Sequence, residues 1–150
     1  MTVFVTGTFD LLHVEHVRFL QAAKAQGDRL IVGIECDVRV KKLKGPSRPF
    51  MGEQDRKEVL EALSSVDEVI ILPEQFDTDD QYEQILKDLR ADIYCVSQGS
   101  PFLEKKQEIC TRAGVALRVV RPHNPEYSTT QLVSKICRTL EVTNLSKGEQ

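Results

Sequence analysis

The 150-residue sequence has no apolar run close to the roughly 20 residues that a helix needs to cross a bilayer. Residues 1–5 are largely apolar, but Thr6 and Gly7 follow at once, so the start does not have the form of a secretory signal. These absences argue against a membrane protein and an exported one. We expect a cytoplasmic protein whose apolar start forms a buried strand.

Cysteine is sparse and has no metal-binding spacing. Cys36, Cys95, Cys110 and Cys137 form no Cys-x-x-Cys pair, and no histidine follows them at zinc-finger spacing. Three of the four lie in apolar segments, where cysteine behaves as a small hydrophobic residue. We therefore expect reduced thiols and no metal bound by the protein itself.

Strong charge of one sign is also absent. The net charge is −3, with 29% charged and 41% hydrophobic residues. This balance argues against a nucleic-acid-binding surface and allows a buried core in about one domain. We expect that domain over residues 1–143 and a polar tail over residues 144–150.

Short apolar runs alternate with amphipathic segments along the chain. The runs are rich in valine and isoleucine, which is typical of parallel strands buried on both faces. Predicted strands cover residues 3–6, 29–35, 69–72, 93–96 and 117–120. Predicted helices cover residues 14–25, 53–64, 80–89, 102–113 and 128–140. This alternation predicts an α/β fold, a Rossmann-like doubly wound five-stranded parallel sheet in a three-layer α/β/α sandwich.

The segment after the first predicted strand carries the clearest chemistry. Gly7 leads into a helix whose first turn presents His13 and His16, three residues apart and therefore on one face. A helix N-terminus attracts phosphate, and histidine donors there would stabilise charge during phosphoryl transfer. The plainer alternative is that His13 caps the helix and His16 is a half-buried surface residue.

Two other site classes have little support in this segment. A dinucleotide-binding domain would carry Gly-x-Gly-x-x-Gly, whereas Gly7 stands alone. A zinc site on His13 and His16 would need further ligands, and no third one is recognisable.

The segment resembles the signature of the cytidylyltransferase-like nucleotidyltransferase superfamily, in which Gly-x-Phe-Asp is followed by His-x-Gly-His. The resemblance implies that the loop and both histidines hold a nucleoside triphosphate. The nucleotide-binding residues implied by position are Gly7, Thr8, Phe9, Asp10, His13 and His16. His13 and His16 would also be catalytic, and the aspartate would have an orienting role.

One residue departs from that signature. Glu15 occupies the place of the glycine between the histidines. Its carboxylate could point outward, because acids are favourable in a first helical turn. Alternatively, it could weaken triphosphate binding and leave a catalytically impaired nucleotide-binding protein.

A second motif concentrates positive charge in segment 41–49. Gly45, Pro46 and Pro49 predict a loop, and the plainer reading is a solvated charge run. The pattern resembles the heptose-phosphate adenylyltransferase branch of the superfamily, with glycerol-3-phosphate cytidylyltransferase-like proteins next. That resemblance implies acceptor-binding roles for Lys42, Lys44 and Arg48, and catalytic roles for Lys44 and Arg56.

A third motif opens the last predicted helix. Hydroxyl residues are ordinary helix caps, but the superfamily binds the triphosphate tail with an Ile-Ser-x-Thr-like motif here. The resemblance implies that Ser128, Thr129, Thr130 and the preceding Arg121 bind nucleotide. Gln98 is a further candidate, in a loop that lacks the acidic residue common in the family.

The sequence thus predicts transfer of an AMP or CMP moiety to a sugar-phosphate or polyol-phosphate acceptor, with release of pyrophosphate. Adenylyl transfer to a sugar 1-phosphate is slightly preferred over cytidylyl transfer to glycerol 3-phosphate. The resemblance implies Mg²⁺ held mainly by the nucleotide phosphates, and a homodimer.

Overall fold

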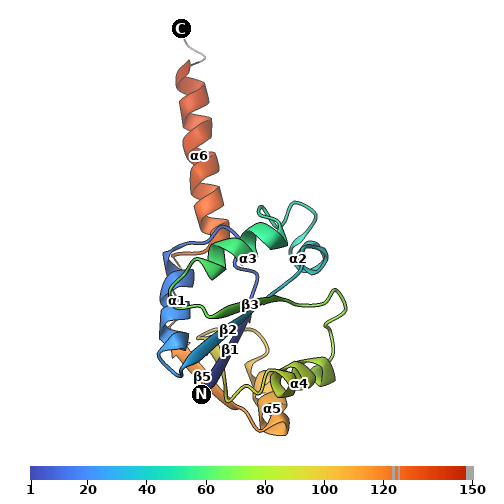
Figure 1. Cartoon of the computed structure of the whole chain (residues 1–150). Helices are drawn as coiled ribbons and strands as arrows, with labels where there is room; N and C mark the ends of the chain where they lie inside the picture. The colour runs from blue at the N-terminus through green and yellow to red at the C-terminus, as the bar shows by residue number, and fades with distance from the viewer. Residues whose placement is uncertain (123, 125, 148–150) are drawn as a thin grey trace.

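The computed structural model describes residues 1–122, 124 and 126–147. In this part of the chain, five strands alternate with six helices (Figure 1). The strands are β1 (Thr2–Gly7), β2 (Arg29–Ile34), β3 (Glu68–Ile71), β4 (Ile93–Ser97) and β5 (Ala116–Arg121). The helices are α1 (Val14–Lys24), α2 (Asp37–Lys44), α3 (Glu53–Glu61), α4 (Asp79–Asp88), α5 (Leu103–Ala113) and α6 (Thr129–Lys147).

The five strands form one parallel sheet in the order β3-β2-β1-β4-β5. The chain winds outward from β1 through β2 to β3, and then returns to place β4 on the other side of β1. Strand order therefore reverses between β1 and β4. Open parallel sheets bind ligands outside the carboxyl ends of the strands at such a point.

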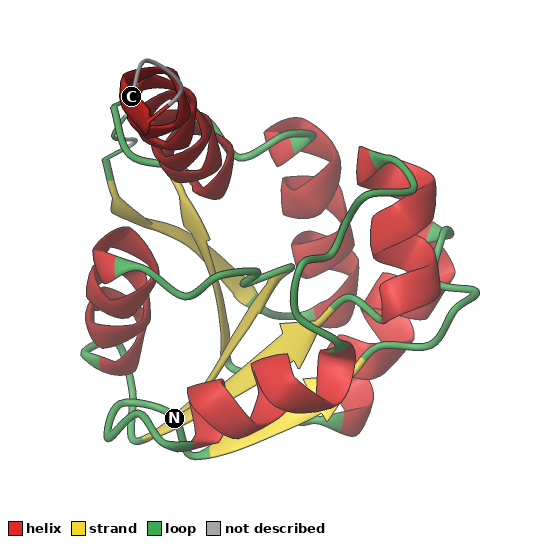
Figure 2. Ribbon diagram, turned by 90° about the horizontal axis from the view of Figure 1, so that it is seen from above, coloured by secondary structure: helices red, strands yellow, loops and turns green. Residues whose placement is uncertain are grey.

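Alternating side chains of the strands build a core on each face of the sheet. Val3 and Val5 of β1 pack with Leu20 of α1 and Leu60 of α3 on one face. Phe4, between them in sequence, lies on the other face, which α4 and α5 cover. Helices thus lie on both sides of the strands (Figure 2), and the predicted three-layer α/β/α sandwich is confirmed.

One helix departs from the sequence prediction, which assigns the lysine-rich segment 41–49 to a loop. Its first part belongs to α2, which ends at Gly45 with a φ of 99°. The helix is short and mostly polar, so its own pattern is weak; tertiary contacts hold it. Val40 is buried, and the buried Arg39 pairs with Glu35 and Asp77 at 2.6 Å each.

The last helix is longer than predicted. It continues past residue 140 to Lys147, across the expected boundary at residue 143, and projects away from the sheet (Figure 1). Residues 148–150 of the predicted tail lie outside the described residues. No helix in the described part of the chain is long and apolar enough to span a membrane.

Candidate active site

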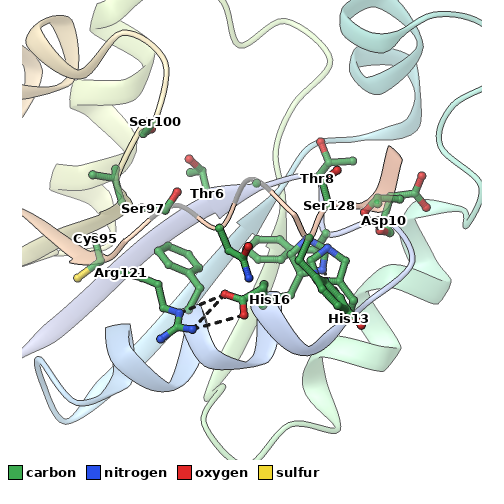
Figure 3. Close-up of a pocket in the computed structure, with 18 of the residues that line it drawn as sticks. Thr6, Thr8, Asp10, His13, His16, Cys95, Ser97, Ser100, Arg121 and Ser128 are labelled. Carbon is green, nitrogen blue, oxygen red and sulfur yellow. Dashed lines mark hydrogen bonds and ion pairs between the residues drawn. The ribbon is translucent and has the colours of Figure 1, made fainter. Parts of the chain in front are cut away.

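A cavity of about 340 Å³ opens at the reversal of strand order, between the carboxyl ends of β1 and β4. Its walls come from the β1–α1 loop, the α2–α3 loop, the β4–α5 connection and the start of α6 (Figure 3). The predicted site residues that line it are Gly7, Thr8, Phe9, Asp10, His13, His16, Lys44, Arg48, Arg121, Ser128, Thr129 and Thr130. Lys42, Arg56 and Gln98 are not among the lining residues.

The β1–α1 loop is shaped by a close contact between a glycine and a ring. A Cβ on Gly7 would lie 2.8 Å from the ring of Phe9, so only glycine fits against that ring. Phe9 and Leu11 have positive φ angles of 51° and 49°. Such strained conformations in bulky residues cluster at ligand-binding sites, and here they turn the loop towards the cavity.

His13 and His16 stack on each other at the start of α1. Their ring centroids are 3.7 Å apart, and Phe9 meets His16 edge-on at 5.3 Å. The backbone N–H of His13 donates to Nδ1 of His16 at 3.4 Å, which leaves Nε2 of the neutral ring to carry the proton. Nδ1 of His13 is buried and has no hydrogen-bond partner among the described residues. Each ring therefore has a nitrogen with no hydrogen-bond partner among the described residues.

Burial and the neighbouring His13 lower the pKa of His16 from 6.5 to about 3. Burial also lowers the pKa of His13, although Glu15 opposes this shift. At neutral pH the pair is therefore uncharged in the free protein. A neutral imidazole still donates one N–H to a phosphate oxygen, and the two stacked rings avoid mutual charge repulsion.

The pKa of His16 makes stability depend on pH. Between about pH 6.5 and pH 3, the unfolded chain binds a proton that folded His16 does not, so acidification favours unfolding. We expect urea denaturation to show a smaller loss of unfolding free energy from pH 7 to pH 4.5 in His16→Asn than in the unchanged protein. Carboxylates such as Asp10 contribute equally to the pH dependence of both proteins. An equal loss of unfolding free energy in both would contradict the lowered pKa of His16.

Asp10 anchors the loop that follows α2. Its carboxylate accepts hydrogen bonds from Arg48 Nε at 3.1 Å and from the backbone N–H groups of Phe50 and Met51 at 2.8 and 3.0 Å. Burial would raise its pKa, but these three donors outweigh it and hold the pKa below its ordinary value. Thr129 donates to the Asp10 carbonyl at 2.8 Å, which ties α6 to the same loop.

The predicted cations separate into two groups. Lys44 and Arg48 line the cavity, and desolvation together with nearby Arg48 lowers the pKa of Lys44. Lys42 lies outside it, exposed and 3.4 Å from Asp77. The spacing of the cations along the chain did not reveal this division, because α2 turns Lys42 and Lys44 in different directions.

The position of Arg56 contradicts the sequence prediction that it is a catalytic cation facing the ligand. Its side chain is completely buried, and its donors are used within the protein. They contact the carbonyls of Met51, Thr8 and Glu35 at 2.8–3.0 Å and Asp37 Oδ1 at 2.8 Å. Arg56 therefore fixes the segments around the cavity and does not face a ligand.

The start of α6 brings a second helix N-terminus to the cavity. Ser128 Oγ accepts from the backbone N–H of Gln131 at 3.2 Å, as a helix cap does. Thr129 and Thr130 occupy the first turn and line the cavity. Together with α1, two helix N-termini direct their partial positive charge at one space, which suits a polyanion.

Glu15 does not point at the histidine pair. Its carboxylate accepts hydrogen bonds from Arg121 Nε and Nη2 at 3.1–3.4 Å, drawn as dashed lines in Figure 3. It also accepts one from Arg18 at 2.7 Å. These guanidinium groups, Arg18 first, hold the pKa of Glu15 below its ordinary value. Two cations thus surround one carboxylate, and the local charge stays positive.

If the cavity binds a nucleoside triphosphate such as ATP, Glu15→Gln should tighten that binding about three- to tenfold at low salt. The variant keeps the side chain's length and frees Arg121 and Arg18 to attract the triphosphate, an effect that salt should screen. Calorimetric titration at 50 and 300 mM salt measures it, with Arg121→Gln as the matched variant expected to weaken binding. Weaker ATP binding by Glu15→Gln would instead mean that Glu15 serves the site by holding Arg121 in place.

Several cavity residues carry little signal in the sequence. Thr6 and the buried Tyr94 share a hydrogen bond of 2.6 Å on the cavity floor, yet each reads as an ordinary strand residue. Ser97, Ser100 and Lys106 form the wall on the β4–α5 side. Gln98, the residue expected there, is exposed and outside the lining.

The described lining residues offer no ready ligand for a protein-held Mg²⁺. Asp10 and Glu15 supply the carboxylates, and each is already bound by arginine or backbone donors. In the described part of the chain, no group of three histidine, cysteine or acidic residues has a metal-binding arrangement.

Comparison with known proteins identifies the family of the chain. A family model described as cytidylyltransferase-like matches residues 4–136. The bifunctional protein HldE of Methylobacillus flagellatus is 46% identical over 102 residues, 68% of this chain and 20% of that protein. HldE of Helicobacter pylori strain G27 is 40% identical over 137 residues, 91% of this chain and 28% of that protein.

A solved structure shares the fold. The lipopolysaccharide core biosynthesis protein from Thermoplasma volcanium superimposes with a TM-score of 0.67 and 26% identity, covering 85% of this chain and 98% of that one. In contrast, the chain spans only 18–28% of the length of the first curated relatives.

Proposed function

Because the chain belongs to the cytidylyltransferase-like family of nucleotidyltransferases, we propose that it transfers a nucleoside monophosphate from a triphosphate to a phosphorylated sugar or polyol, releasing pyrophosphate. The observation that carries the proposal is the stacked His13–His16 pair at one of two helix N-termini facing a single cavity. Neutral N–H donors and helix dipoles suit a triphosphate there.

The reaction needs positioning and charge stabilisation more than covalent chemistry. An oxygen of the acceptor phosphate attacks the α-phosphorus, and the bond from that phosphorus to the oxygen bridging to the β-phosphate breaks. His13 and His16 donate hydrogen bonds to oxygens whose negative charge grows during this step. Lys44 and Arg48 hold phosphates in line, and Asp10 fixes Arg48 through their contact at 3.1 Å.

Mg²⁺ enters this proposal with the nucleotide. When bound, it neutralises charge on the phosphates, as in other phosphoryl transfers. The occupied carboxylates of Asp10 and Glu15 support a role in which the chain contributes donors and the ion is coordinated by phosphates and water.

An adenylyl transfer to a sugar 1-phosphate, such as a heptose phosphate, is our preferred specific reaction. It is supported by the relatives named HldE and by the lysine-rich segment that resembles heptose-phosphate adenylyltransferases. Cytidylyl transfer to glycerol 3-phosphate comes next. We place the enzyme in the cytoplasm.

We further propose that the chain forms a homodimer. The support is the projecting helix α6, whose Ile136 and Leu140 are more than half exposed. Apolar faces of isolated helices are stabilised by packing against a partner.

Pyrophosphate release tests the proposed reaction. ATP and CTP are each offered with Mg²⁺ and a panel of mannose 1-phosphate, heptose 1-phosphate, heptose 7-phosphate and glycerol 3-phosphate. The proposal expects release with ATP and a sugar 1-phosphate, and none when either substrate is omitted. Tight ATP binding without release from any pair would favour the impaired nucleotide-binding protein that Glu15 suggests.

A further inference from the structure

A second cavity of about 260 Å³ adjoins the first on the side of α4 and α5. Its apolar wall is aromatic: Phe76 and Tyr82 lie with ring centroids 4.3 Å apart, and Phe102 stands at the rim with Ile109 behind. Lys106 lines both cavities. Lys106 is thus a wall residue that the two cavities share.

Lys106 differs from the other charged residues of the second cavity in having no carboxylate partner among the described residues. Arg39 pairs with Glu35 and Asp77 at 2.6 Å, and Lys105 pairs with Asp79 at 2.9 Å. The half-buried Lys106 instead donates to the neutral hydroxyl of Ser100 at 2.7 Å. Desolvation lowers the pKa of Lys106 because it disfavours the charged ammonium, and an anion bound beside it would stabilise that charge.

The position of Lys106 is better suited to binding the phosphate of the acceptor, which attacks the α-phosphorus, than to binding the triphosphate. The helix N-termini with His13, His16 and Ser128 lie on one side of the cavity, and Ser97 and Ser100 lie on the other (Figure 3). In-line displacement needs the attacking and leaving oxygens on opposite sides of the phosphorus. A phosphate held at Lys106 would approach from the side opposite the helix N-termini.

Phe102 gives a second, independent sign of ligand binding beside this ammonium. Its side chain is 76% exposed, and its φ of 58° is in the left-handed region, where a bulky residue is strained. Strained backbone conformations cluster at ligand-binding sites. An aromatic face there can cover the C–H face of a carbon skeleton.

We propose that Lys106 binds the acceptor's phosphate at the junction of the two cavities, and that its sugar skeleton extends into the aromatic cavity of Phe76, Tyr82 and Phe102. This inference rests on the proposed function and deepens it, because it assigns the acceptor side of the reaction. The acceptor is then a phosphorylated sugar whose carbon skeleton is large enough to reach Phe102. Its hydroxyls would form hydrogen bonds with charged residues of the second cavity such as Asp77, Asp79 and Lys105.

The test combines steady-state kinetics with direct binding to Lys106→Met. We expect the acceptor KM to rise at least tenfold, while kcat at saturating acceptor and the Kd for ATP change less than threefold. Phe102→Ala, which truncates an exposed ring and leaves the core intact, should raise the acceptor KM three- to tenfold. Lys87→Met is the matched control, because this exposed lysine lies on α4 outside both cavity linings and pairs with Glu83.

Two results would overturn the inference. One is an unchanged acceptor KM in an active, folded Lys106→Met protein; the other is loss of ATP binding with the acceptor KM unaffected. Titration of mannose 1-phosphate observed by NMR separates this inference from the proposed reaction. If no substrate pair releases pyrophosphate but Lys106→Met still abolishes sugar-phosphate binding, the reaction fails and the subsite stands.

Discussion

Replacing His16 with alanine is expected to lower kcat by about 10²–10³-fold, the usual cost of removing one donor that stabilises transition-state charge. His16 faces the cavity, receives the backbone N–H of His13 on Nδ1, and keeps Nε2 free to donate. If His16 donates more strongly as charge develops in the transition state, the Kd for ATP should change less than about tenfold. Pyrophosphate release and calorimetry on the same preparation measure the two effects.

Gln21→Ala provides the matched control for this experiment. Gln21 lies on the same helix, α1, with its side chain exposed and away from the cavity. Its replacement should leave kcat unchanged. If His16→Ala lost ATP binding and turnover in equal proportion, His16 would be a ground-state binding residue, contrary to the transition-state role.

Replacing Arg56 with methionine is expected to lower the unfolding free energy by about 3–5 kcal/mol, as when one partner of a buried ion pair is removed. Arg56 joins α3 to the β1–α1 loop, to the end of β2 and to Asp37 at the start of α2. Without it, buried carbonyls lose their donor and cannot reach water. Urea denaturation followed by circular dichroism measures the change.

Arg29→Met separates this effect from the loss of any arginine. Arg29 is exposed and pairs with the partly exposed Glu68, so its removal should hardly move the denaturation midpoint. A similar midpoint for both variants and the unchanged protein would contradict the structural role of Arg56. ATP affinity measured well below the midpoint should change little, since Arg56 is not in the cavity.

The fold could be predicted from the sequence because the patterns that mark its strands and helices are local. Apolar runs bounded by turn residues mark five strands that differ from the observed ones by only one or two residues at their ends, and Gly114 marks the end of α5. The family resemblance is confirmed by the matching family model. It could be recognised from the sequence because each of its motifs lies in one contiguous segment. Helix α2 was inaccessible because Arg39 and Val40 are held by residues far away in sequence.

The sequence could predict site residues only where several of them lie together in one short segment. The histidine pair and the first turn of α6 lie in the cavity, as their spacing from strand ends suggests. A cation's partner depends on the whole fold, so sequence could not separate Arg56, which is buried, from Arg48, which faces the cavity. Lys106 gave no signal either, because consecutive lysines on a helix are usually solvated.

Transfer of a nucleotidyl group can be followed with labelled ATP. The most direct measurement incubates the protein with Mg²⁺, a sugar 1-phosphate and ATP labelled with ³²P at either the α- or the γ-position. If the chain transfers a nucleotidyl group, α-label enters a sugar nucleotide identified by mass spectrometry, and γ-label leaves as pyrophosphate. Transfer of γ-label to the sugar, or retention of all label in ATP, would contradict it.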